Sequence, residues 1–332
     1  MIAGDLAKQY LRKFPSAPTN QIAKMLIRDH PLIFEDKEAA RGLVRYYRGA
    51  HGARDKDKLQ DTDMIRSIEE GIELRYNPYG FPDAVDDAWT PMPLPIRRGR
   101  GVILADLHLP YHEVRALTMA FGWATKELYT DFVVYNGDFF DFHGFSKFER
   151  DPEARKFSDD IKTANALLDA TEKAFPSAQI ILKLGNHDNR LRRYLRTKAP
   201  ELFDLQDFLI EEQLQIRKRG AILVPHDVPL TVGRLNILHG HEIRSFSAVN
   251  PARGMFLKSL ECTISAHLHK TSQHTSVTMM GRNITCWSLG CLCNLHPEYA
   301  RINDWNWGCA GITVDGTDFE IDNRRIFEDM VR

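Results

Sequence analysis

Residues 179–188 read Gln-Ile-Ile-Leu-Lys-Leu-Gly-Asn-His-Asp, an apolar run that ends in an amide, an imidazole and a carboxylate. A short apolar run closed by glycine predicts a buried strand that opens into a loop. Three such polar side chains would be unfavourable together in a packed apolar core. We therefore expect this turn to belong to a functional site, and we expect other parts of the chain to bring polar groups to it.

Overall composition limits the class of protein. The chain has 332 residues, of which 43% are hydrophobic and 27% charged, and its formal net charge is -1. These values are ordinary for a globular protein and do not favour bulk attraction to nucleic acid. No apolar run could span a bilayer, and the first residues lack the apolar segment of a secretory signal. We expect a cytoplasmic protein that does not bind membranes, and the sequence does not indicate its oligomeric state.

Residues 1–54 predict a small basic domain of three helices. Apolar residues recur at helical spacing in three segments between residues 6 and 48. The region has ten Lys or Arg against five Asp or Glu, and four of the basic residues share one face of the last predicted helix: Lys37, Arg41, Arg45 and Arg48. Two interpretations stay open. A helix-turn-helix-like unit would contact nucleic-acid phosphates through this face, whereas a plain helical cap would expose it to solvent.

The chain changes character after this domain. Residues 55–99 lack periodicity and become rich in proline, which predicts an extended connector. Residues 100–332 begin with alternating strands and helices, expected at 102–105, 113–128, 132–135, 159–175 and 180–182. This alternation predicts a mostly parallel sheet with crossover helices.

The later part of residues 100–332 has shorter spacings, which predict β-hairpins at residues 230–238, 274–288 and 312–321. This part should therefore contribute a more antiparallel sheet. We predict an α/β fold of four layers, α/β/β/α, in which two mixed sheets pack face to face between outer helices.

Metal-capable side chains follow five of the predicted strands. In the first group, Asp106-Leu107-His108, we expect an extended backbone that points residues i and i+2 the same way, so that Asp106 and His108 share an ion. The other groups are Asn136-Gly137-Asp138 with Asp141, Gly185-Asn186-His187-Asp188, His239-Gly240-His241 and His267-Leu268-His269. Each group alone is explained by chance or by an ordinary hydrogen-bonded histidine. Together, at the carboxyl ends of strands, they predict one ligand site.

The donor types indicate the kind of metal. Mixed His, Asp and Asn donors suit Mn²⁺, Fe or Zn²⁺ better than Ca²⁺. Two imidazole-rich half-sites that share one carboxylate imply a dinuclear centre, which can stabilise both the attacking and the leaving oxygen in phosphoryl transfer. We expect two divalent ions, with Mn²⁺ first and Fe, Zn²⁺, Ni²⁺ or Mg²⁺ as alternatives. The pair Cys291 and Cys293 lacks zinc-finger spacing, and we interpret both as buried or idle thiols.

The order of these motifs, D-x-H, G-D-x-x-D, G-N-H-D, H-G-H and H-x-H, resembles the calcineurin-like metallophosphoesterase superfamily over residues 100–325. The resemblance implies that one metal is held by Asp106, His108, Asp138 and His269. It implies that a second metal, with a metal-bridging hydroxide as the nucleophile, is held by Asp138, Asn186, His239 and His267.

The resemblance also implies the acid–base groups. His187 would bind the phosphate and protonate the leaving oxygen, and Asp141 would orient His187. His241 is interpreted as a phosphate contact or a neighbour of the ligands, and Asp188 as structural. Residue 142 is Phe142 rather than the arginine of the protein Ser/Thr phosphatases, which counts against action on phosphoproteins.

We therefore expect a metal-dependent phosphoesterase that acts on a phosphate ester. A phosphodiesterase or nuclease-like activity on nucleic acid or nucleotides is the leading hypothesis, because basic residues gather in the N-terminal helices and at Arg190 and Arg193. Trp305, in the irregular segment 291–307, could stack a base. Plainer explanations of these rim residues are a solvated helix face and loop packing. The alternative functions are a phosphomonoesterase on a small nucleotide or other ester and a non-catalytic binding protein.

Overall fold

The structure is a computed structural model of the chain, and it describes residues 3–34, 36–48, 90–128, 130–146, 156–243, 249–327 and 330–332. The chain divides into two compact units, Met1–Asp86 and Asp87–Arg332, and each is considered by itself. Most of the predicted connector, residues 55–89, lies outside the described residues. Within the described ranges, no helix combines the length and the apolar character needed to cross a membrane.

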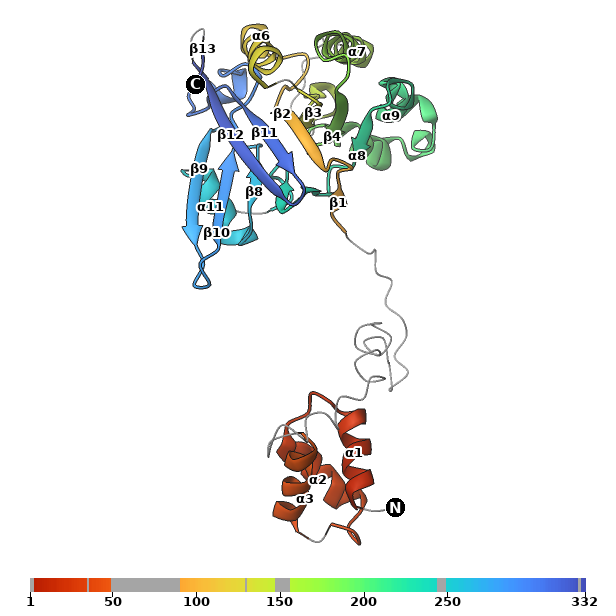
Figure 1. The fold of residues 1–332 in the computed structure, drawn as a ribbon. Coiled ribbons are helices and arrows are strands. Elements are labelled where there is room, and N and C mark those ends of the chain that lie inside the picture. The colour runs from red at the N-terminus through yellow and green to blue at the C-terminus, as the bar shows by residue number, and fades with distance from the viewer. Residues whose placement is uncertain are drawn as a thin grey trace. The chain divides into compact units, whose positions relative to one another are not determined.

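The first unit contains the three helices that the sequence predicts (Figure 1). Asp36 begins the third of them, because its side chain accepts a hydrogen bond of 2.9 Å from the Ala39 amide. The helices are α1 (Ala3–Lys13), α2 (Thr19–Asp29) and α3 (Lys37–Tyr47). Each buries an apolar stripe in a common core.

The basic face of α3 is smaller than the sequence suggested. Arg48 turns back toward the start of α2, where it donates a hydrogen bond to Thr19 Oγ1 (3.1 Å). Arg41 forms an ion pair of 2.8 Å within its own helix. Lys37 and Arg45 remain exposed. A helix-turn-helix-like role for this unit stays a prediction.

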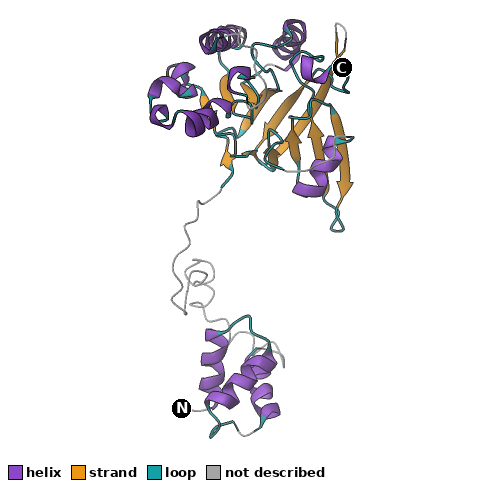
Figure 2. Ribbon diagram, turned by 180° about the vertical axis from the view of Figure 1, so that it is seen from behind, coloured by secondary structure: helices purple, strands orange, loops and turns teal. Residues whose placement is uncertain are grey.

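The larger unit is built on two sheets (Figures 1 and 2). The first contains, among the described residues, seven strands in the order β13-β12-β11-β2-β3-β4-β5. Its parallel part consists of β2 (Arg98–Leu104), β3 (Phe132–Asn136), β4 (Gln179–Lys183) and β5 (Ile222–Val224). The first three come from the predicted alternation, whereas β5 was not predicted. Beyond β2 the sheet continues antiparallel with β11 (Gly308–Asp315), β12 (Asp318–Phe327) and β13 (Met330–Val331).

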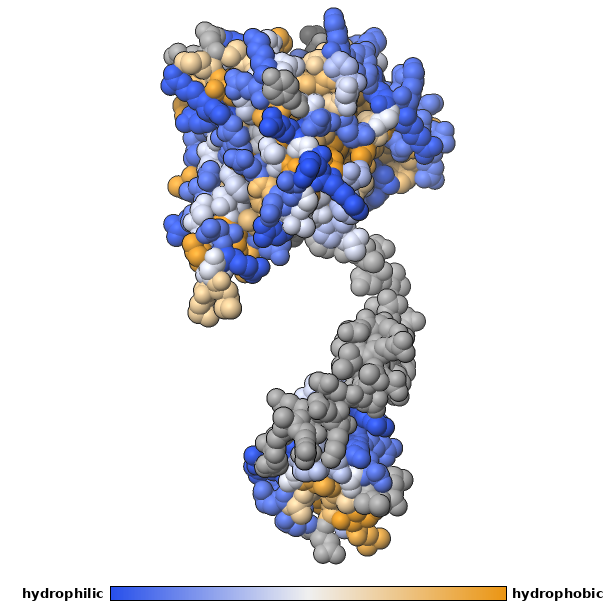
Figure 3. Space-filling view, in the orientation of Figure 1, coloured by the Kyte–Doolittle hydropathy of each residue, from blue (hydrophilic) through white to orange (hydrophobic). Residues whose placement is uncertain are grey.

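The second sheet has six described strands in the order β1-β6-β7-β8-β10-β9, with both parallel and antiparallel pairs. These strands are β1 (Met92–Pro93), β6 (Leu230–Val232), β7 (Leu235–Ile237), β8 (Thr263–Ser265), β9 (Ser272–Val277) and β10 (Asn283–Ser288). The hairpin between β9 and β10 ends in the exposed Met279 and Met280, and its tip is pale orange in Figure 3.

Helices cover the outer faces of both sheets (Figure 2). The first sheet is covered by α6 (Val114–Trp123), which continues as one π-helical turn (Ala124–Leu128), and by α7 (Phe157–Ala174) and α8 (Arg190–Lys198), with the short α9 (Ile210–Gln213) and α10 (Ile216–Arg219) near β5. The second sheet is covered by α11 (Pro251–Ser259). Single 3-10 turns lie at His143–Phe145, Pro200–Leu202, Gln206–Phe208 and Glu298–Ala300.

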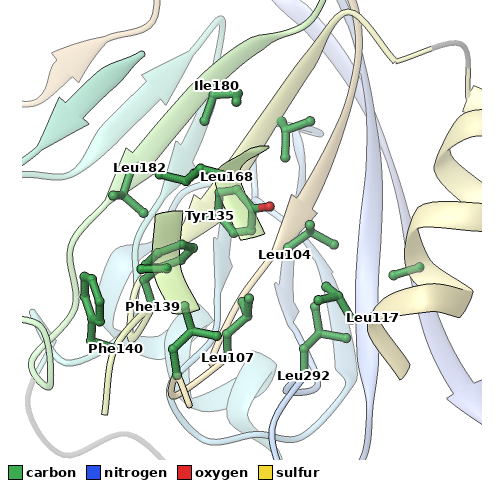
Figure 4. Close-up of a cluster of buried hydrophobic side chains, with 14 of the residues drawn as sticks. Leu104, Leu107, Leu117, Tyr135, Phe139, Phe140, Leu168, Ile180, Leu182 and Leu292 are labelled. Carbon is green, nitrogen blue, oxygen red and sulfur yellow. The ribbon is translucent and has the colours of Figure 1, made fainter. Parts of the chain in front are cut away.

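Alternate residues of the central strands enter two different cores. On β2, Leu104 joins Tyr135 and Leu117 in the core beneath the helices (Figure 4). Its neighbour Ile103 faces the second sheet and shares a core with Ile264. Strands covered on both faces are continuously apolar, which is why their sequences are apolar runs rather than alternating patterns. The layers are therefore α/β/β/α, as predicted.

Candidate metal centre

Five loops meet at one edge of the two sheets, each directly after a strand. In the first sheet they follow β2, β3 and β4, and in the second they follow β7 and β8; both sets are parallel neighbours. Parallel neighbours place their carboxyl ends at the same edge. The loops carry the predicted residues Asp106, His108, Asp138, Asp141, Asn186, His187, His239, His241, His267 and His269.

The backbone of these loops is unusual. Asp106, His108, Asp138, His267 and His269 all have a positive φ, between 48° and 68°, a region that non-glycine residues rarely occupy. The prediction of an extended backbone in the D-x-H segment is therefore wrong. Asp106 and His108 converge because two left-handed residues turn the chain just after β2. Backbone strain of this kind concentrates at functional sites.

Two glycines let the loops approach one another closely. A Cβ on Gly185 would lie 2.2 Å from Asp138 Oδ1, and one on Gly137 would lie 2.2 Å from His239 Nδ1. Gly137 also has a φ of +85°. Larger residues would push the loops apart, which explains why the G-D and G-N-H motifs begin with glycine.

One group of donor atoms surrounds Asp106. Its Oδ1 lies 3.3 Å from His269 Nε2 and 4.0 Å from His108 Nε2, and these two nitrogens are 3.2 Å apart. Asp138 Oδ2 lies 3.8 Å from His108 Nε2. All four side chains are buried. The structure therefore brings together the four donors that the sequence assigned to one metal.

A second group lies on the other side of Asp138. Asp138 Oδ2 is 3.2 Å from His239 Nε2, and His267 completes a cluster whose donor atoms all lie within 4.8 Å of one another. Asn186 comes from the adjoining loop, and its Oδ1 is buried. Asp138 thus contacts both groups, the arrangement expected of a bridging carboxylate.

The centre concentrates ionised groups in a buried place. Burial disfavours the carboxylates of Asp106 and Asp138, but the surrounding histidines outweigh it and hold both pKa values below their usual range. Burial likewise disfavours the charged rings of His239 and His269, yet Asp138 and Asp106 raise the pKa of His239 to about 10, and chiefly Asp106 raises that of His269 to about 9. Burial and the neighbouring His239 lower the pKa of His267 to about 4.

These properties fit divalent cations. The buried side-chain atoms that have no hydrogen-bond partner among the described residues include three of the predicted donors: Asp106 Oδ1, Asn186 Oδ1 and His239 Nε2. A metal supplies the positive charge and the bonds that such oxygen and nitrogen donors need. His239 Nδ1 lies 3.0 Å from Asn136 O. This contact fixes the ring and leaves Nε2 for a metal, as outer partners of metal-bound histidines do.

His187 stands beside these donors with partners of its own. Its Nδ1 lies 2.9 Å from Asp141 Oδ1, and its amide donates to Asp138 Oδ1 at 2.8 Å. The same Asp141 oxygen lies 3.3 Å from His108 Nδ1. Burial opposes ionisation of Asp141, but hydrogen bonds from His108 and His187 outweigh it and lower its pKa. Arg190 donates to Asp141 O (2.8 Å), and its Nη2 lies 3.0 Å from His187 Nε2.

Asp188 holds the turn from inside. It is fully buried and accepts hydrogen bonds from the amides of Gly185 (2.6 Å), Phe140 (2.7 Å) and Phe139 (3.3 Å). These bonds tie the loop after β4 to the loop after β3. The side chain thus has a structural role, in keeping with the expectation from sequence.

A family model for the calcineurin-like phosphoesterases matches residues 100–280. The chain belongs to this family. The family is one of metal-dependent phosphoesterases that bind divalent metals, in agreement with the donor set, and its fold is the two-sheet sandwich described above.

The chain is 26% identical over 231 residues to the gene 54 protein of Mycobacterium phage D29, a match that covers 65% of this chain and 89% of the phage protein. Among solved structures, it is similar to Vps29 from Cryptosporidium parvum, with a TM-score of 0.40 and 10% identity over 71% of this chain and 96% of that one. Vps29 from Chaetomium thermophilum gives a TM-score of 0.37 and 13% identity over 69% and 92%.

An ion pair that sequence reasoning missed supports the H-G-H loop of this calcineurin-like phosphoesterase. Lys183 ends β4 fully buried, and its Nζ lies 2.7 Å from Glu242 Oε1. Glu242 accepts hydrogen bonds from the amides of His239 (3.1 Å) and Gly240 (2.7 Å). The sequence does contain a signal for this pair, namely a lysine within the otherwise apolar run 180–184. A buried charge needs a partner, so such a lysine indicates an acidic residue close to it in the fold.

His241 lies beside the second group of donors. Its ring centroid is 5.3 Å from that of His239, and it stacks on His226 at 5.7 Å. Its Nδ1 lies 3.5 Å from Glu242 Oε2. Burial lowers the pKa of His241 to about 4, more than Glu242 raises it.

Of the three predicted rim residues, Arg190 and Trp305 lie at the centre and Arg193 does not. The Trp305 ring is 4.1 Å from that of His269, at 70°. Tyr299, 6.3 Å from Trp305, is 71% exposed. Arg193 is exposed on α8, where the described residues show no contact between it and the donor clusters.

Proposed function

We propose that the chain is a phosphodiesterase of nuclease-like type, which hydrolyses phosphodiesters of nucleic acid or nucleotides and uses two divalent cations, with Mn²⁺ the first candidate. The observation that carries the proposal is the position of Asp138, whose Oδ2 lies 3.2 Å from His239 on one side and 3.8 Å from His108 on the other. When bound, the cations supply the Lewis-acid chemistry that neutralises the phosphate and activates the attacking water.

His187 is the proposed general acid. Because its Nδ1 faces Asp141 at 2.9 Å, Nε2 is the atom left to hold a proton for the leaving oxygen. Asp141 stabilises the charged ring and fixes its orientation, and its own pKa is lowered, so that it stays ionised when the ring is neutral.

Arg190 is the proposed phosphate contact. Its Nη2 lies 3.0 Å from His187 Nε2, so a guanidinium lies beside the imidazole nitrogen that is proposed to donate the proton. A phosphate oxygen can accept hydrogen bonds from both groups at once. The exposed Tyr299 and the neighbouring Trp305 support a nucleotide substrate, because aromatic side chains stack on bases.

The enzyme proposal is tested with an aryl phosphodiester and an aryl phosphomonoester in the presence of Mn²⁺. We expect the wild-type chain to hydrolyse the diester faster, and Asp138→Asn to lose activity on both. Absence of metal-dependent turnover on either ester would refute the activity and favour a binding protein. Faster turnover of the monoester, confirmed on mononucleotides, would favour the phosphomonoesterase alternative.

We further propose that residues 1–54 contact nucleic acid through Lys37 and Arg45, which are exposed on α3. The full chain carrying Lys37→Glu and Arg45→Glu should bind DNA or RNA more weakly and with a smaller salt dependence. Lys258→Glu with Arg282→Glu, on the larger unit, makes the same charge change and serves as the control. If both double variants bind nucleic acid with equal affinity, the basic face of α3 is a solvated surface that does not contribute to binding.

A further inference from the structure

Cys293 lies beside the Asp106 end of the centre, although its spacing suggested an idle thiol. Its sulfur and one ring nitrogen each of His108 and His269 lie within 4.8 Å of one another. All three residues are buried, with 4% of His108, 5% of His269 and 4% of Cys293 exposed. Two imidazoles and a thiol at this separation can bind the same ion.

The loop after β10 fixes the position of this thiol. Leu292 donates its amide to Asp106 O (3.2 Å) and accepts a hydrogen bond from the Glu113 amide (2.8 Å). Cys293 O accepts a hydrogen bond from Trp307 Nε1 (2.9 Å). The backbone around the sulfur is therefore held on both sides, and Asp106 itself provides one of the contacts. A metal site requires ligands fixed in this way by their supporting residues.

Three of the other cysteines lie away from the centre. Cys286 packs beneath α11 and Cys309 beneath α6, each in an apolar core, and Cys262 is partly exposed. The buried Cys291 lies near Cys293 and His269, and its thiol contacts Asn306 O at 3.7 Å. All five cysteines lie in the described residues, and within these Cys293 is the one that belongs to a cluster of metal-capable side chains.

A second observation at this end of the centre points to an ion. Asp106 Oδ1 is buried and has no hydrogen-bond partner in the described part of the chain. It lies 3.3 Å from His269 Nε2 and 4.0 Å from His108 Nε2, and the Asp106 residue is fully buried. Buried polar atoms are normally paired, so this oxygen, the two ring nitrogens and the thiol together indicate a cation site.

We propose that Cys293 is a thiolate ligand of the metal held by Asp106, His108 and His269. This assignment rests on the dinuclear centre proposed above. On coordination, the S–H bond is replaced by a sulfur–metal bond, and the proton leaves to solvent. Thiolate favours Zn²⁺ or Fe over Mn²⁺ and Mg²⁺. The two metal positions then differ, because Asn186, His239 and His267 at the other position offer nitrogen and oxygen.

Cobalt substitution tests the assignment without relying on activity. The metal-free full chain is loaded with two equivalents of Co²⁺, and its absorption spectrum is recorded. We expect a thiolate-to-cobalt charge-transfer band in the near ultraviolet. Cys293→Ser should lose the band, and Cys286→Ser, which changes a thiol buried beneath α11, should keep it. Zinc affinity of Cys293→Ser should fall by at least roughly 10–100-fold, the loss typical of removing even an outer partner of a ligand.

A measurement on the wild type alone covers the case in which Cys293→Ser does not fold. X-ray absorption of the wild-type chain loaded with two equivalents of Zn²⁺ should show a sulfur neighbour at about 2.3 Å from zinc. Nitrogen and oxygen neighbours without sulfur would overturn the assignment. Two bound cobalt ions with ester hydrolysis but no charge-transfer band would overturn the Cys293 ligand alone, whereas failure to bind cobalt would overturn the dinuclear centre as well.

Discussion

A single carboxylate oxygen connects the proposed acid to the metal donors. Asp141 Oδ1 lies 2.9 Å from His187 Nδ1 and 3.3 Å from His108 Nδ1. The His187 amide donates to Asp138 Oδ1 at 2.8 Å, and its ring Nε2 lies 4.0 Å from Asp138 Oδ2, in a cluster with His108. Replacing the His187 side chain removes the proposed proton donor and leaves in place the donors that are assigned to the two metals.

We expect His187→Ala to keep near-normal metal content and to lose roughly two to four orders of magnitude in turnover of the aryl diester, the usual scale for a general acid. Metal analysis after gel filtration and steady-state kinetics are the measurements. Loss of a full equivalent of metal in this variant would show that His187 is a ligand instead.

Arg190 and Arg193 are a matched pair on α8. Arg190 contacts both Asp141 and His187, whereas Arg193 is exposed. We expect Arg190→Met to lower kcat/KM by roughly 10–100-fold, because it removes a hydrogen bond from a charged group worth about 1.5–3 kcal/mol. Arg193→Met should stay within a factor of about two, well under 1 kcal/mol. A similar loss in both variants would mean that the effect comes from the helix rather than from phosphate contact.

At the scale of elements, the Lys183–Glu242 pair joins the end of β4 to the loop after β7 and so links the two sheets. Breaking one side leaves a buried charge. We expect Glu242→Gln to lower the free energy of unfolding of the metal-free chain by about 3–5 kcal/mol, measured by urea denaturation. The double variant Lys183→Met, Glu242→Leu should recover much of this loss. A double variant as unstable as the sum of its single variants would show that the pair does not act as a unit.

The same pair gives stability a pH dependence of known sign. Burial opposes ionisation of Glu242, but Lys183 and His241 outweigh it and lower its pKa to about 2. A carboxyl whose pKa is lowered in the folded state stabilises the fold above its unfolded value of about 4.3 and loses that contribution as the pH falls toward 2. Unfolding free energies measured from about pH 6 to about pH 2 should therefore fall more steeply in the wild type than in Glu242→Gln, with the difference between roughly pH 4.5 and 2. Parallel curves would contradict this.

The central strands were predictable because their buried stretches are apolar on both faces, namely residues 102–104 of β2, 132–135 of β3 and 180–182 of β4. β12 was predicted only at residues 319–321, and the structure extends it to Asp318–Phe327. Its burial alternates only weakly, and only one of its ten residues is buried. The pairing with β11, rather than local sequence, therefore determines its length.

The candidate site was likewise predictable only in part. Histidines and carboxylates at strand ends could be found because their types and order are local features of the sequence. Lys183, Glu242 and Cys293 were not assigned, because each acquires its role from a partner distant in the chain. The local backbone conformation could not be predicted either, since nothing in the D-x-H motif indicates that Asp106 and His108 adopt left-handed conformations.

At the scale of the whole molecule, the donors of the centre come from both sheets of the unit Asp87–Arg332, so bound metals cross-link its two layers. Metal that binds only the folded state at a thousand times its Kd adds about 4 kcal/mol per site. For a domain of this size we expect chelation with EDTA to lower Tm by roughly 10 °C or more. All five tryptophans lie in this unit, so tryptophan fluorescence during heating reports on it alone. Asp138→Asn, which removes the shared carboxylate, should lose most of the chelator-dependent shift. An unchanged Tm of the wild type with EDTA and with saturating Mn²⁺ would contradict a metal that bridges the sheets.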